Sequence, residues 1–151
     1  MEPNEKSEFV AEFCHLTIEL RYKLRKLFLA KLKEASISIS FEALEAMKFL
    51  YKQNGLNQQE LADMLFKDKS SMTYLLDNMV KAGWVIRKED DADRRNKLIF
   101  LTENAYQLKE QLAPMATSCY LALAEDVTLP DVKNGVQTLL KMNNSLTEFI
   151  L

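Results

Sequence analysis

Glycine, proline, cysteine and histidine are all scarce in this chain of 151 residues, which has three glycines, three prolines, two cysteines and one histidine. Three glycines leave no glycine-rich loop of the kind that cradles a phosphate. A single histidine and no cluster of metal-ligating residues leave no catalytic set. We therefore expect no enzyme activity, no catalytic residues, no cofactor and no metal site.

The two cysteines, Cys14 and Cys119, are too far apart in the sequence for a zinc-binding or CxxC motif. No apolar run approaches the roughly 20 residues that a transmembrane helix needs. The first six residues are polar and acidic, unlike a signal peptide. These absences predict a protein of the reducing cytoplasm with no membrane partner.

Charge is distributed unevenly along the chain. The formal net charge is −2, yet residues 67–97 contain eight basic and six acidic side chains. Attraction to a polyanion must therefore come from this segment. A surplus of two charges is a weak signal by itself, and its meaning depends on the motif that contains it.

Residues 56–101 predict two short helices followed by a two-stranded ribbon. Asn57 is a suitable N-cap, and Glu60 three residues later completes a capping box. Asp68 can cap the second helix, and Gly83 can end it in the left-handed conformation. Each helix has one apolar stripe, formed by Leu61, Ala62, Leu65 and Phe66 on the first and by Met72, Leu75, Leu76, Met79 and Val80 on the second.

Two β-rich runs follow at residues 84–87 and 98–101, joined by the charged segment 88–97. Helix, turn, helix and hairpin, in this order, are the outline of a winged helix-turn-helix, which reads DNA. The predicted fold class is therefore mainly α with a small β-hairpin wing.

Helices are also predicted on both sides of this motif. The first covers residues 5–34, and the next is capped by Ser40. A helix capped by Thr102 continues to about residue 125, with a kink or break near Leu112 caused by Pro114. A capping box of Thr128 and Asp131 begins the last helix.

We expect a single domain over residues 1–151, with a DNA-binding lobe at about 40–102 and dimerisation helices at about 5–34 and 103–151. A helix over residues 5–34 is about 45 Å long at 1.5 Å per residue. Its apolar surface, with that of the last helices, exceeds what a small central motif can cover. This surplus predicts a homodimer, and a monomeric helical bundle with a frayed first helix is the alternative.

The segment 57–102 closely resembles the MarR family of bacterial transcriptional regulators. The residues that match the family pattern are Asp68, Lys69, Ser70, Thr73, Leu76, Asp77, Met79, Gly83, Trp84, Val85, Arg87, Asp93, Arg94, Arg95, Leu101, Thr102 and Glu103. The resemblance implies an obligate homodimer with interlocked terminal helices and two winged motifs on a pseudo-palindromic operator of double-stranded DNA. We expect a repressor released by a small aromatic or amphipathic effector that binds between the dimerisation helices and the DNA-reading lobe.

The polar face of the second motif helix is the candidate reading surface. Short hydroxyls and an amide can donate or accept at base edges in the major groove. Lysines on the same helix suit phosphates, which set register and salt dependence. We assign Ser70, Ser71, Thr73, Tyr74 and Asn78 to base edges or adjacent phosphates, and Lys67, Lys69 and Lys81 to phosphates. The competing interpretation is an ordinary solvated helix face.

In the ribbon, Arg94 and Arg95 lie at the turn between strands, where a guanidinium can enter a narrow minor groove. The resemblance implies that Arg95 is the inserted residue and that Asp93 orients an arginine through a salt bridge. Arg87 and Lys97 complete the expected DNA contacts. The acidic residues Glu89, Asp90, Asp91 and Asp93 either weaken DNA binding or hold the turn. A tip charged only for solubility is the competing interpretation.

Two other residues have alternative interpretations. Trp84 is interpreted as a packing residue rather than a stacking platform.

Some MarR family members sense peroxides with a cysteine near the start of the first helix, which is oxidised to a sulfenic acid. A redox role for Cys14 beside His15 is therefore one alternative function. However, adjacent residues on a helix do not face each other, and such a cysteine is more often small and buried. A protein-interaction module that has lost DNA binding is the other alternative.

Overall fold

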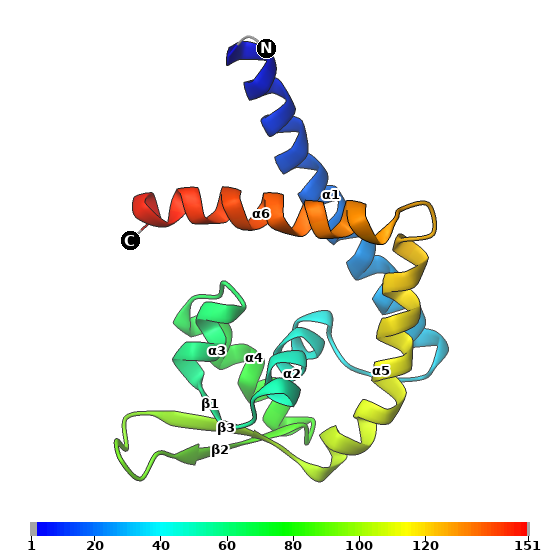
Figure 1. Ribbon diagram of the computed structural model, residues 1–151. Coiled ribbons are helices and arrows are strands. Elements are labelled where there is room, and N and C mark those ends of the chain that lie inside the picture. Colours follow the sequence, from blue (N-terminus) through cyan, green and yellow to red (C-terminus); the bar gives the residue numbers. More distant parts are fainter. Residues whose placement is uncertain (1–2, 151) are drawn as a thin grey trace. The chain divides into compact units, whose positions relative to one another are not determined.

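The computed structural model describes residues 3–150. The elements are α1 (Pro3–Glu34), α2 (Phe41–Lys52), β1 (Leu56–Asn57), α3 (Gln58–Met64), α4 (Lys69–Lys81), β2 (Val85–Glu89), β3 (Lys97–Leu101), α5 (Glu103–Leu123) and α6 (Leu129–Ile150), as Figure 1 shows. The predicted fold class is confirmed. The chain divides into two compact units, Met1–Met115 and Ala116–Leu151. The assignment of dimerisation helices stays a prediction.

The helices begin at the residues that local sequence chemistry selects. In the capping box of α3, the Glu60 amide donates to Asn57 Oδ1 at 2.8 Å and the Asn57 amide donates to Glu60 Oε2 at 3.2 Å. Each bond satisfies an amide that the first helical turn leaves without a partner. The other predicted caps are also present: Ser40 on α2, Asp68 on α4, Thr102 on α5, and Thr128 with Asp131 on α6.

Two helices of the motif end through a residue with positive φ. Gly83 has φ +82°, and the next amide, of Trp84, donates to the Met79 carbonyl at 2.9 Å, as predicted for a glycine cap. After α3 the same position is taken by Phe66, with φ +53°. Its predicted place in the apolar stripe is wrong, because the chain leaves the helix at this residue and the ring is 96% exposed.

The sheet is antiparallel, with strand order β1-β3-β2. Val85 pairs with Leu101 and Glu89 with Lys97, so both hairpin strands extend beyond the predicted runs. The short strand β1 was not predicted. Gly55, just before it, has φ +83° and donates its amide to the Ile99 carbonyl at 2.9 Å.

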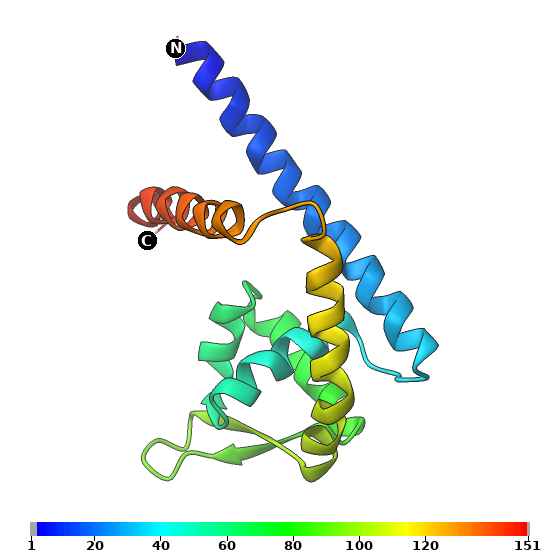
Figure 2. The same ribbon diagram turned by 45° about the vertical axis from the view of Figure 1, so that its right-hand side comes forward.

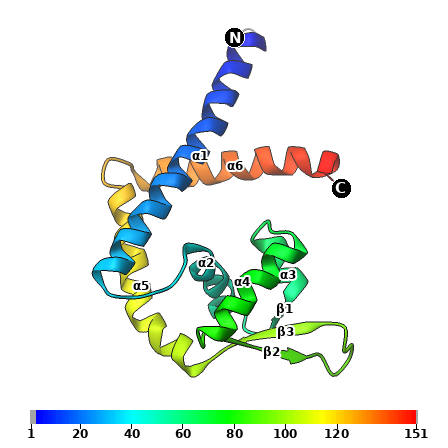
Figure 3. The same ribbon diagram turned by 180° about the vertical axis from the view of Figure 1, so that it is seen from behind.

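Helices α2, α3 and α4 lie on one side of this sheet, with the β2–β3 loop projecting at its end (Figures 1 and 3). We call these elements, residues 41–101, the winged lobe. Its core is built from the predicted stripes, and Trp84 packs against it as expected. Besides Phe66, Val80 is an exception, at 39% exposed. The fully buried residues include Met47, Leu50, Leu61, Met72, Leu76, Met79, Val85 and Ile99.

Helix α1 contacts the winged lobe through its C-terminal half, where Phe28 and Leu32 are buried. Phe28 packs edge-on against Phe41 of α2, with ring centroids 5.8 Å apart. The N-terminal half extends away from the lobe, as Figure 2 shows, and is almost entirely exposed. The first residues of α5 close the core of this unit with Ala105, Leu108 and Leu112.

The second unit consists of the end of α5 and all of α6. Helix α5 continues past Pro114 to Leu123 without the predicted break. On α6 the large apolar side chains are exposed, with Leu129 at 65% and Leu140 at 55%. Within residues 3–150, no helix is both long enough and apolar enough to cross a membrane.

Candidate DNA-binding site

The polar face of α4 is directed outward because the opposite face is locked into the core. Met72 and Leu76 are completely buried, whereas Tyr74 is 72% exposed. Asp68 fixes the start of the helix by accepting the Ser71 amide at 2.7 Å. Of the residues predicted to contact DNA here, Lys69, Ser70, Ser71, Tyr74, Asn78 and Lys81 are exposed, and Lys67 and Thr73 are partly exposed.

A groove of about 580 Å³ runs between this face and the N-terminal end of α2. It brings together five predicted residues with three others: Lys67, Ser70, Ser71, Tyr74 and Asn78, and Ser40, Glu42 and Leu75. The sequence reasoning missed Ser40 and Glu42 as site residues because they precede the motif by many positions. Only the packing of α2 beside α4 places them here.

Thr73 is less free than its neighbours on α4. Its hydroxyl donates to the Lys69 carbonyl at 2.9 Å and accepts from Gln58 Nε2 at 2.8 Å. A hydroxyl has one hydrogen to donate and two lone pairs. Thr73 therefore retains a single accepting position for a base or phosphate partner.

Arg87 lies between the wing and α4. It forms a 2.7 Å ion pair with Asp77, and its Nη2 donates to the Thr73 carbonyl at 3.2 Å. Its side chain is 25% exposed. The arrangement ties β2 to α4. The contact of Arg87 with DNA stays a prediction.

The wing tip is organised by aspartates that accept backbone amides. Asp93 accepts the Arg95 amide at 3.1 Å, and its two carboxylate oxygens accept from the Arg95 guanidinium at 3.1 and 3.2 Å. These bonds hold the pKa of Asp93 below its usual value, and the side-chain bond from Arg95 has a larger effect than the backbone bond. The predicted salt bridge is confirmed, and it leaves the Arg95 side chain 91% exposed.

The other charges of the ribbon are partly paired. Asp90 accepts the Ala92 amide at 3.0 Å, and Lys97 forms a 3.0 Å ion pair with Glu89. Arg94 is exposed at the tip. Three of the four acidic residues thus hold the ribbon in shape, which favours the second of the two roles considered for them.

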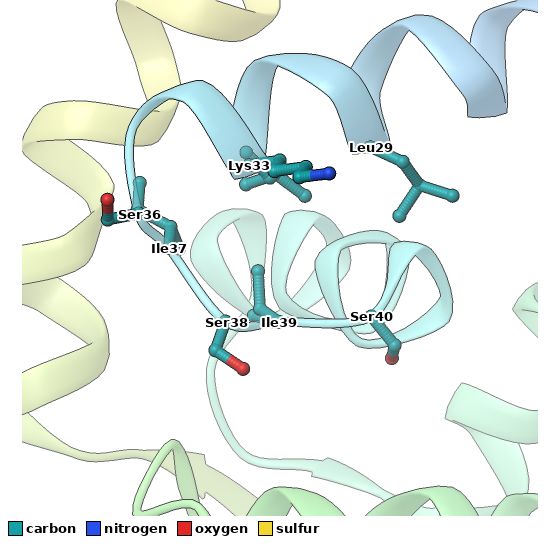
Figure 4. Close-up of a pocket in the computed structure, with 8 residues that line it drawn as sticks. Leu29, Lys33, Ser36, Ile37, Ser38, Ile39 and Ser40 are labelled. Carbon is teal, nitrogen blue, oxygen red and sulfur yellow. The ribbon is translucent and has the colours of Figure 1, made fainter.

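A second concavity, of about 640 Å³, lies at the junction of α1 and α2. Leu29 and Lys33 of α1 form one side, and the loop from Ser36 to Ser40 forms the other (Figure 4). Its walls are apolar at Leu29, Leu32, Ile37 and Ile39 and polar at Lys33 and the serines. Ser40 borders both this concavity and the groove beside α4.

The two cysteines differ in exposure. Cys119 is 2% exposed, whereas Cys14 is exposed on α1. The interpretation of Cys14 as a small buried residue is therefore wrong for the single chain. Within the described residues of its own unit, the N-terminal half of α1 lies beyond the core, which explains the difference.

Known proteins share both the sequence pattern and the fold. The sequence pattern of the MarR family matches residues 39–97. The organic hydroperoxide resistance transcriptional regulator of Bacillus subtilis (strain 168) is 27% identical over 106 residues, which are 70% of this chain and 72% of that protein. The HTH-type transcriptional regulator SarZ of Staphylococcus aureus (strain USA300) is 25% identical over 116 residues, 77% of each chain. Residues 39–97 therefore form a MarR-family domain.

Solved structures resemble this chain over most of its length. One described as "Structure of reduced AbfR bound to DNA" has a TM-score of 0.76 at 19% identity and covers 96% of this chain and 99% of its own. Another, S. aureus MepR in DNA-binding conformation, has a TM-score of 0.78 at 23% identity, with coverage of 89% and 98%. The likeness in fold extends beyond residues 39–97, the part that matches in sequence.

Proposed function

We propose that this MarR-family protein is a sequence-specific DNA-binding transcriptional regulator, a repressor released by a small-molecule effector. The observation that carries the proposal is the outward polar face of α4 beside a wing tip whose arginine is held by Asp93 yet exposed. The two features suit the major and the minor groove respectively. Relatives named as transcriptional regulators, and a structural neighbour bound to DNA, support it.

Each exposed group has a role in this proposal. Helix α4 is the recognition helix, with the hydroxyls and the amide of Ser70, Ser71, Tyr74 and Asn78 directed at base edges or nearby phosphates. Lys67, Lys69 and Lys81 neutralise phosphates and make the affinity depend on salt. Arg95 enters the minor groove, and Arg94 lies beside it on the backbone.

A homodimer belongs to the same proposal. Helix α1 exposes Phe9 at 59% and Ile18 at 68%, and α6 exposes Phe149 at 83%. Isolated apolar residues on a surface are ordinary, but long helices with many of them indicate a partner surface. Two copies would present two recognition helices to half-sites about 34 Å apart, one turn of DNA. Light scattering of the full chain should give twice the chain mass.

The test of DNA binding is a gel shift with the promoter region of the protein's own gene. Arg95→Ala should bind more weakly than wild type at moderate salt, because it loses the minor-groove cation. Lys26→Ala is the control, since it removes the same charge from α1. Equal affinities of Arg95→Ala and wild type would contradict the wing assignment. No binding of wild type to any random-sequence DNA pool would overturn the regulator and favour the protein-interaction module.

We place the effector in the concavity between α1 and α2. Apolar walls and the Lys33 ammonium suit a small amphipathic carboxylate, and an occupant there would contact both α1 and the loop that leads into α2. Octanoate should weaken DNA binding by wild type and by Lys26→Met, but not by Lys33→Met. Equal release of all three proteins would remove this site from the proposal.

Release by peroxide through Cys14 is a second candidate function, favoured by the exposed thiol. The thiolate would attack the terminal oxygen of a hydroperoxide and become a sulfenic acid, while the alkoxide leaves and takes up a proton as an alcohol. The B. subtilis relative is named for organic hydroperoxide resistance. Cys14→Ser should bind DNA normally and ignore cumene hydroperoxide. A variant that is still released by the peroxide would eliminate this candidate.

A further inference from the structure

Two ion pairs, one helical turn apart, join α1 to α2. Arg21 binds both carboxylate oxygens of Glu45, at 2.7 and 3.0 Å, and Arg25 binds Glu42. Both guanidinium groups lie over the ring of Phe41, at 5.4 and 5.7 Å from its centroid. The two pairs therefore share their helices, their chemistry and their aromatic neighbour.

The two carboxylates differ in what lies on their other side. Glu42 lines the groove beside the recognition helix together with Lys67, whereas Glu45 does not. Burial raises the pKa of Glu42, but the hydrogen bond from Arg25, a bond from the backbone amide of Glu42 itself and the charges of Arg25 and Lys67 outweigh it and leave the pKa below its usual value. Glu42 is thus an anion at neutral pH, at the edge of the surface proposed for DNA.

An anion in this position opposes the proposed function. DNA carries one negative charge per about 1.7 Å of helix axis, so a carboxylate at the rim of the groove would repel the backbone and compete for Lys67. The charge of Arg25 cancels that of Glu42 at contact distance. Exposed charges further than about 8 Å apart are screened at physiological salt, so a local partner is required.

We propose that Arg25 masks the charge of Glu42 and so makes α1 a determinant of DNA affinity without contact to DNA. The inference rests on the proposed DNA binding and goes beyond it, because it assigns a positioning role to a residue of a dimerisation helix. It follows that any movement of α1 against α2 that separates this pair lowers the affinity for DNA.

The test is a series of charge-neutralising variants of the full chain. Fluorescence anisotropy measures their binding to a fluorescein-labelled 30-base-pair duplex of mixed sequence. Arg25→Met should weaken binding about three- to tenfold at low salt, because each protomer then presents an unmasked carboxylate. Glu42→Gln should tighten binding by a similar factor. The double variant, which has the net charge of wild type, should return to within about twofold of wild type.

Arg21→Met and Glu45→Gln are the matched controls, because they break the same kind of pair on the same two helices away from the groove. Arg21 interacts with Glu42 only through its charge, whereas Arg25 is bonded to it. Both should stay within about twofold of wild type. Thermal unfolding midpoints are measured for every variant, and affinities are compared at a temperature at which all are folded. The difference between Arg25→Met and wild type should shrink as salt is raised, which a purely structural role would not produce.

Two outcomes would overturn the inference: equal weakening by Arg25→Met and Arg21→Met, or failure of Glu42→Gln to restore binding in the Arg25→Met background. A wild-type protein that binds the duplex, with a series that shows no change, rejects the masking alone. A wild-type protein that binds neither this duplex nor its own promoter region rejects the proposed function itself.

Discussion

Arg87 on β2 and Asp77 on α4 form a 2.7 Å ion pair that joins the wing to the recognition helix. The second bond of the guanidinium, to the Thr73 carbonyl, holds the same helix one turn earlier. Since the wing and the helix are proposed to read different grooves, the angle between them must match the DNA. We propose that Arg87 sets that angle rather than contacting a phosphate.

Asp77→Asn separates these two roles. If Arg87 positions the wing, the variant should bind DNA more weakly and lose about 1 kcal/mol of stability, because a charged partner is removed from a partly buried arginine. If Arg87 contacts DNA, removal of Asp77 should instead tighten binding. Asp91→Asn, which removes the same charge from the exposed tip, is the control and should bind slightly more tightly. Anisotropy and urea unfolding measure the two effects.

Thr73 and Tyr74 should behave differently although they are neighbours on α4. Thr73→Val leaves Gln58 Nε2 without its acceptor, so it should cost about 1 kcal/mol of stability and change sequence preference little. Tyr74→Ala should leave stability almost unchanged and relax the preference at one base position, by about 1–3 kcal/mol. Selection of bound sequences from a random pool, together with urea unfolding, distinguishes them. A shift in the sequences selected by Thr73→Val would contradict this division.

Tyr51 should make stability depend on pH in the alkaline range. Its hydroxyl donates to the Ala105 carbonyl at 2.6 Å, and burial, with a smaller effect of Tyr106, raises its pKa from 10.0 to about 12. A pKa raised by folding stabilises the protein below the unfolded value, and this contribution is lost as the pH rises from 10 to about 12.

The measurement is urea unfolding at pH 8, 10 and 11.5. Tyr51→Phe should be about 1 kcal/mol less stable than wild type at pH 8, because the Ala105 carbonyl loses its donor. The difference should narrow as the pH rises. Tyr22→Phe, at an exposed position on α1, is the control and should follow wild type throughout. A constant difference between Tyr51→Phe and wild type would contradict the pKa shift.

Much of the fold could be predicted because its signals are local. The capping box of Asn57 and Glu60 and the stripe from Met72 to Met79 each act within a few residues, and both are present. The β1 strand could not be predicted, because a two-residue strand has no periodicity of its own. It exists through its pairing with Ile99 and Leu98, about 40 positions later. Phe66 was wrongly predicted to lie in the apolar stripe of α3, because apolar character says nothing about the φ angle at a helix end.

In the candidate site, too, features with a local signal could be predicted, and features that depend on packing between elements could not. Polar residues on α4 could be assigned to one face from their spacing alone, as could the exposed arginines of the tip. Two features were inaccessible to such reasoning. Arg87 was counted as a DNA contact because its partner Asp77 lies on a different element, and Glu42 was missed because only packing brings α2 to α4. Both features depend on contacts between elements, which spacing does not encode.

Gly55 and Gly83 form a matched pair for measuring two kinds of backbone constraint. Both have φ near +80°, so an alanine at either position should cost about 1–2 kcal/mol through left-handed strain. Only at Gly55 would the new Cβ also lie 2.8 Å from Phe100 Cε1; at Gly83 the nearest atom is Asn104 Nδ2, at 3.8 Å. Gly55→Ala should therefore be the more destabilising by about 1 kcal/mol or more.

Asparagine sharpens the comparison, because it tolerates the left-handed conformation better than alanine. Gly83→Asn should recover part of the stability lost in Gly83→Ala, since strain is the only penalty at that position. Gly55→Asn should recover little, because its Cβ meets the Phe100 ring as that of alanine does. Urea unfolding midpoints of the four variants provide the measurement. Equal losses of stability in Gly55→Ala and Gly83→Ala would contradict this prediction. They would mean that the Phe100 ring moves aside for the new Cβ, so that its contact with Gly55 does not constrain the turn before β1.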